Sequence, residues 1–137
     1  MKTTIARYVN NGTQTVAANA NILFTNNTFS NCALGYDNLG GIQIKKPGTY
    51  AIYASLLGVA TGTNPVIVTM YENGIAVPGA ASGATPAAIG NLMPLSLVGL
   101  TTVKQTCNRD IYATITFKSN EATSFSNATV IIEKIEE

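Results

Sequence analysis

Short segments with one apolar face, separated by turn residues, follow one another along nearly the whole chain. In the clearest of them, segment 65–72, Val66, Val68 and Met70 share one face. The next pair, Asn73-Gly74, favours a type I′ hairpin turn, because both central residues of that turn adopt positive φ. No segment shows a sustained helical period. Evenly spaced short strands, about ten of them, predict an all-β protein that is either a sandwich or a barrel.

The strands are expected at residues 3–9, 13–17, 21–25, 32–36, 42–45, 49–59, 65–72, 75–77, 92–104, 110–118 and 128–135. The polar segment 26–31 is expected to be a connection. We expect the strand that begins at Ile75 to end at Pro78-Gly79, and residues 79–90 to form a loop or an irregular edge strand, because Gly and Pro interrupt them. No linker divides the 137 residues, so a single domain, 1–137, is predicted.

The composition excludes several function classes. Histidine is absent, which rules out Ser-His-Asp and Cys-His catalysis and His-ligated zinc or haem. The seven carboxylates show no calcium-loop spacing, and no glycine run forms a phosphate loop. We therefore expect no catalytic residue, no metal site and no cofactor. A net charge of +1 predicts no nucleic-acid partner.

No apolar run approaches the ~18 residues that a membrane span needs, so no membrane partner is predicted. The first residues lack the long apolar segment of a secretory signal. We therefore expect the chain to be made in the cytoplasm without a cleaved leader.

Segment 49–59 is apolar on both of its faces. Tyr50, Ile52 and Ala54 share one face, which we expect to pack between the sheets. The other face carries the predicted subunit interface, Ala51, Tyr53, Leu57 and Val59, because a strand that is apolar on both sides needs a second cover. Tyr112, on a strand face that suits a subunit contact and solvent equally well, is added to this set.

The two cysteines, Cys32 and Cys107, leave two interpretations open. As a disulfide they would close a long loop, worth about 4 kcal/mol in the chain-entropy model. As free thiols they would be unpaired groups of a protein made in a reducing cytoplasm. The sequence does not give the Cα separation that decides between them.

Two segments carry a family resemblance. The run from Ile42 to Ser55, IQIKKPGTYAIYAS, resembles the complement-type globular head of the tumour necrosis factor-like jelly-roll superfamily, in which an apolar strand, a glycine turn and a Gly-x-Tyr strand follow in that order. The run VTMYENG, from Val68 to Gly74, resembles the next hairpin of that family. Segments 110–117 and 128–133 are similar to its last two strands. The resemblance implies a single jelly-roll domain, a two-sheet antiparallel sandwich of about ten short strands, that forms a homotrimer.

Within that superfamily the chain is most similar to small stand-alone structural proteins of tailed phages of Gram-positive bacteria. No Gly-X-Y repeat precedes the domain, unlike the collagen-stalked spore-surface members. The resemblance thus implies a non-enzymatic virion protein, a trimeric capsid decoration or head-fibre protein at the virion surface. Its partner would be the major capsid protein or another shell protein. The alternative is an adhesin of a bacterial cell or spore surface, or a phage receptor-binding head, that binds a host surface glycan or receptor.

The expected contact with the particle lies at the amino-terminal segment. Lys2 and Arg7 are the only charged side chains before Asp37, and the segment has little side-chain bulk. We therefore predict capsid attachment through Lys2, Thr3, Ile5 and Arg7. The small-residue segment 79–90 is the second candidate for this contact.

Overall fold

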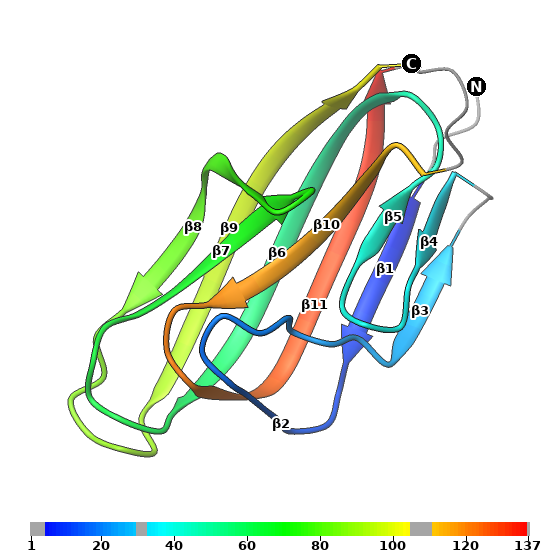
Figure 1. Ribbon diagram of the computed structural model, residues 1–137. Helices are drawn as coiled ribbons and strands as arrows, with labels where there is room; N and C mark the ends of the chain where they lie inside the picture. Colours follow the sequence, from blue (N-terminus) through cyan, green and yellow to red (C-terminus); the bar gives the residue numbers. More distant parts are fainter. Residues whose placement is uncertain (1–4, 30–32, 105–110, 137) are drawn as a thin grey trace.

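The computed structural model describes residues 5–29, 33–104 and 111–136, and these residues form eleven β-strands in two antiparallel sheets that pack face to face (Figure 1). The predicted all-β sandwich is confirmed. In the part of the chain that is described, no helix is long and apolar enough to span a membrane.

Each sheet combines strands that are far apart in the sequence. The first, sheet A, has the order β3 (Asn26–Phe29), β1 (Ile5–Asn10), β11 (Thr123–Glu136), β6 (Gly48–Ala60), β9 (Leu92–Val103), and β2 (Gln14–Val16) pairs with the start of β11. The second, sheet B, has the order β4 (Leu34–Tyr36), β5 (Ile42–Ile44), β10 (Ala113–Ser119), β7 (Val66–Glu72), β8 (Ile75–Ala84). The edge strands β8 and β9 lie together along one side of the sandwich (Figure 1).

The core forms where the inward faces of the two sheets meet. Tyr50, Ile52 and Ala54 of β6 are buried, as the alternation of segment 49–59 predicts. Phe117 of β10 is fully buried, and its ring meets Phe24 edge to face at a centroid distance of 6.2 Å. Phe24 also meets Tyr8 edge to face at 6.5 Å. This aromatic cluster ties sheet A to sheet B, because its rings come from both.

Tyr8 combines complete burial with a polar contact. Its hydroxyl donates a hydrogen bond of 3.1 Å to the carbonyl oxygen of Gly35 in β4, across the sandwich. Burial raises the pKa of the Tyr8 phenol above its usual value of about 10, because the apolar surroundings disfavour the phenolate. The folded protein therefore keeps this proton at a pH at which the unfolded chain loses it.

We expect Tyr8→Phe to lower the free energy of unfolding by about 1 kcal/mol at pH 8, because the Gly35 carbonyl loses this donor. Above about pH 10 the unfolded wild type releases the Tyr8 proton and the folded form keeps it, so wild-type stability falls as pH rises. The variant has no such proton to lose, so the difference in the free energy of unfolding between the two proteins should be smaller at pH 11 than at pH 8. Urea unfolding at both pH values measures it; an equal difference at both would contradict the prediction.

The turn predicted at Asn73-Gly74 is confirmed. Both residues have positive φ, 52° and 83°, and Glu72 pairs with Ile75 across the turn. The Asn73 side-chain oxygen also accepts a hydrogen bond of 2.9 Å from the backbone N–H of Thr114. The hairpin of β7 and β8 is thereby attached to the neighbouring strand β10.

The prediction that this second strand ends at Pro78-Gly79 is wrong. Strand β8 continues to Ala84. Residues 77–80 interrupt the pairing with β7, and the regular register resumes at Ala81, opposite Thr69. Pro78 has no backbone N–H to donate, which is tolerated because β8 is an edge strand. Gly79 accommodates the sharp bend with a φ of 77°.

Two further predictions near the amino terminus are wrong. The expected polar connection at 26–31 contains strand β3, which pairs with β1 from Asn26 opposite Val9 to Phe29 opposite Ala6. Here a free sheet edge outweighs the low strand propensity of asparagine. The expected strand at 21–25 is reduced to one isolated bridge between Asn21 and Lys118.

Candidate interaction surface

The outward face of sheet A carries large apolar side chains in its central and edge strands. Tyr53 of β6 is 45% exposed, and Val98 and Leu100 of β9 are 56% and 59% exposed. Ile131 of β11 is 40% exposed. Residues directly opposite one another in paired strands point to the same face, and Ile131, Tyr53 and Val98 are paired in that order. They therefore form a continuous apolar row across three strands.

A hollow of about 240 Å³ lies in the middle of this face. Its lining comprises Tyr53, Ala54, Ser55, Ser96, Leu97, Val98, Thr129 and Ile131. Small serine side chains on β6 and β9 lower the surface between the larger residues, so the face is apolar and hollowed. A side chain of a partner can enter such a surface, and apolar patches of this kind on a monomer mark interaction sites.

The structure brings four of the five predicted interface residues onto this face. Ala51, Tyr53, Leu57 and Val59 follow one another on the outward side of β6. Of the four, Tyr53 is the most exposed, and Ala51, at 4%, contributes little surface. Tyr112 directly precedes β10 of sheet B and packs partly against the core, so it is not brought together with the other four.

Sequence reasoning missed Val98, Leu100 and Ile131. The signal was present in the alternation of Leu92–Val103, in which every second residue is exposed. Large apolar side chains occupy several of those exposed positions. What the sequence could not supply was the pairing of β9 and β11 with the two sides of β6.

The part of the same face over β3, β1 and the middle of β11 is polar. A hollow of about 480 Å³ there is lined by Arg7, Val9, Asn11, Asn26, Thr28, Asn127 and Thr129. Arg7 is exposed, pairs with Ile131 of β11 on one side and with Thr28 of β3 on the other, and forms no salt bridge with a carboxylate of the described residues. This half of the face thus has an unpaired cation among amides and hydroxyls.

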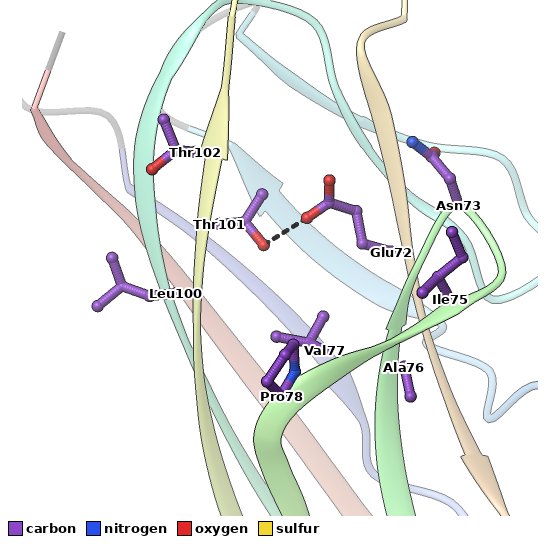
Figure 2. A pocket seen from close by; sticks show the side chains of 9 residues that line it. All are labelled: Glu72, Asn73, Ile75, Ala76, Val77, Pro78, Leu100, Thr101 and Thr102. Carbon is purple, nitrogen blue, oxygen red and sulfur yellow. Dashed lines mark hydrogen bonds between the residues drawn. The ribbon is translucent and has the colours of Figure 1, made fainter.

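A further hollow, of about 290 Å³, lies at the β8–β9 side, between the β7–β8 hairpin and the end of β9 (Figure 2). The Glu72 carboxylate points into it, and its Oε1 accepts a hydrogen bond of 2.8 Å from the hydroxyl of Thr101, which is 3% exposed. Ile75, Pro78 and Leu100 line the same hollow. Figure 2 shows Leu100 on the opposite side of β9 from Thr101. One carboxylate among apolar groups suits a cationic side chain on an apolar stem.

Other predicted site residues lie partly outside the described residues. Lys2 and Thr3, expected to attach to the capsid, and Cys32 and Cys107, expected to be either bridged or free, all belong to the undescribed segments. For Ile5 the structure gives only the start of β1. In the described residues, no group of three His, Cys, Asp or Glu side chains gathers in a metal-binding arrangement.

Two sheets of six and five antiparallel strands, with β8 and β9 closing one side, define a jelly-roll sandwich of the tumour necrosis factor and complement C1q type. The globular domain of zebrafish complement 1qA protein superimposes with a TM-score of 0.70 at 9% identity, over 96% of this chain and 95% of that one. Eiger TNF from S. frugiperda gives 0.74 at 8% identity, over 96% and 91% of the two chains.

Murine APRIL gives a TM-score of 0.71 at 13% identity, over 98% of this chain and all of that one. No family model matches the sequence. No curated protein matches it significantly either. At these identities the solved structures establish the fold, and the predicted jelly roll is confirmed.

Proposed function

We propose that the chain is a homotrimeric, non-enzymatic structural protein that coats a particle, as a capsid decoration or head-fibre protein of a virion. The observation that carries the trimer is the apolar, hollowed outward face of sheet A around Tyr53, Val98 and Ile131. That face needs a cover, and the tumour necrosis factor-like fold, whose members are typically trimers, provides a geometry in which copies of one chain supply it.

Support for a non-catalytic role comes from the side chains available. Histidine is absent from the sequence. Of the two carboxylates with a described side-chain hydrogen bond, Asp37 holds its own loop through the N–H groups of Leu39 and Gly41, at 2.7 and 2.8 Å. The other, Glu72, accepts from Thr101. Neither faces a second acid or a base within the described residues, which general acid–base chemistry would require.

Support for a shell protein, as opposed to an adhesin, comes from the composition and the resemblance to phage structural proteins. Charged residues are only 11% of the chain, and its polar surface consists largely of amides and hydroxyls. For attachment we retain Lys2 and Thr3, because Ile5 and Arg7 belong to β1, and Arg7 lies on the face assigned to the subunit contact. The exposed end of segment 79–90 is the second candidate for attachment, at the other end of the sandwich (Figure 1).

The test is whether the protein travels with particles. In a lysate of the producing culture, an antibody to the chain should detect it in the particle band of a density gradient. A variant without residues 1–4, which precede β1, should remain trimeric and no longer bind empty particles. Full occupancy by the truncated trimer would overturn attachment through this segment. Recovery with the cell or spore surface, together with binding to host glycans, would instead support the adhesin alternative.

A further inference from the structure

Three-fold closure places two demands on the surface of each subunit. Rotation about a three-fold axis joins one patch of a subunit to a different patch of its neighbour, unlike the self-complementary contact of a two-fold dimer. The chain therefore needs a second patch that complements the outward face of sheet A. The β8–β9 side of the sandwich is such a patch, since it carries exposed Ile75 and Pro78 around the Glu72 hollow.

Arg7 is the group on the face that most needs a partner. Among the residues of sheet A whose side chains are described, alternation places two charged groups on the outward face, Arg7 and Glu133. No salt bridge joins them. Covering an unpaired guanidinium with another subunit would be strongly unfavourable, because a buried charge needs an opposite charge and hydrogen bonds. The covering patch must then supply an acceptor.

Glu72 is the described carboxylate best placed to be that acceptor. Asp37 already accepts from two backbone N–H groups of its own loop. Glu121 lines a hollow between residues 61–66 and 121–122, at the other end of the sandwich from the termini. Within the described residues, one oxygen of Glu72 accepts a hydrogen bond, from Thr101, and the other accepts none; the hollow beside it opens at the edge of the sandwich.

The heights of the two groups along the strands also agree. Arg7 belongs to the paired row that ends at Val98 of β9, three residues before Thr101, the partner of Glu72. Three residues correspond to roughly 10 Å along a strand. Rotation about an axis that runs along the strands leaves height unchanged, so the extended side chains of Arg7 and Glu72 would together have to span the remaining offset.

We propose that Arg7 of one subunit enters the hollow beside Glu72 of the next and forms an ion pair with it, three times per trimer. This inference rests on the proposed trimer and adds its second contact surface. The guanidinium pairs with the free oxygen of Glu72, and the aliphatic part of Arg7 packs against Ile75 and Pro78. The pair fixes which edge meets which face, so it specifies a closed ring in preference to other associations of the apolar surface.

Charge reversal tests the pair. Arg7→Glu and Glu72→Arg should each weaken trimer association at least roughly tenfold per contact, because each places like charges together in a buried site. The double variant Arg7→Glu/Glu72→Arg should recover most of the wild-type association. Sedimentation equilibrium over a concentration series measures all four proteins, and circular dichroism checks that each is folded.

Neutral variants keep the test valid if a reversed charge prevents folding. We compare Arg7→Gln, Glu72→Gln and the double variant that carries both changes. Trimer association of the double variant should be no weaker than that of either single variant, because the first change already removes the pair. Glu133→Gln is the matched control on the same face, and it should leave association unchanged. Additive effects in the cycle, or rescue of Arg7→Glu by Glu133→Arg in place of Glu72→Arg, would overturn the pair.

The outcome separates the pair from the trimer itself. A trimer that is dissociated by a lysine at Val98 and unaffected by Arg7→Glu would retain the proposed function and overturn this inference. A wild-type chain that sediments as a monomer would overturn the proposed trimer, and the ion pair with it.

Discussion

Val98→Lys and Tyr53→Lys are each expected to convert the proposed trimer, three times 14.3 kDa, into monomers. Both side chains line the apolar hollow at the centre of the outward face of sheet A. A buried ammonium there would have no carboxylate beside it among the lining residues, and leaving a buried charge unpaired costs about 3–5 kcal/mol. The loss occurs at each of three contacts, which is enough to separate the subunits at micromolar concentration.

Sedimentation velocity at about 10 µM measures this result, because at that concentration a trimer with a dissociation constant near 1 µM is still assembled and a weakened one is not. Thr116→Lys is the matched control, because Thr116 lies in β10 on the outward side of sheet B, pairs with Tyr71 and is half-buried. It introduces the same charge without touching the proposed contact. A trimer that persists in Val98→Lys and Tyr53→Lys, or a control that dissociates equally, would contradict the interface.

Phe117→Ala is expected to destabilise each subunit by about 3–5 kcal/mol, the usual loss when a fully buried aromatic ring is removed. Phe117 has no exposed surface and holds Phe24 by an edge-to-face contact, so the cavity opens where the two sheets meet. This loss is a large part of the free energy of unfolding of a typical domain, which is about 5–15 kcal/mol.

Urea unfolding at one fixed protomer concentration measures this effect, because oligomer stability depends on concentration. Thr116→Ala, one residue earlier on the opposite face of β10, controls for the loss of a side chain at this point of the strand. Equal decreases in the free energy of unfolding of the two variants would contradict the prediction that the buried ring stabilises the core.

Predictions that depended on neighbouring residues succeeded. The Asn73-Gly74 turn needs positive φ at two adjacent residues, and that requirement is visible locally. The two apolar faces of β6 were likewise visible in one strand, and the structure places Tyr53 and Leu57 on the outward one; their role as subunit contacts stays a prediction. The buried face of β10 followed from the alternation of Ala113, Ile115 and Phe117.

Predictions that depended on sheet neighbours failed or stayed incomplete. Asn26–Phe29 becomes a strand because β1 offers it a free edge, and β8 continues beyond Pro78 because β7 remains beside it. The placement of Tyr112 with the other sheet, and of Val98 and Ile131 on either side of Tyr53, follows from strand order, which local periodicity does not encode.

The start of β1 and the end of β11 lie side by side, since Ile5 pairs with Glu133, and the turn between β6 and β7 lies at the far end of the sandwich (Figure 1). At that turn Gly62 is exposed and has open space around it. A peptide inserted between Gly62 and Thr63 would therefore extend away from both chain ends. On the proposed trimer, with the proposed attachment at its amino-terminal end, such a graft would be presented in three copies that all face outward, and the scaffold would suit multivalent display.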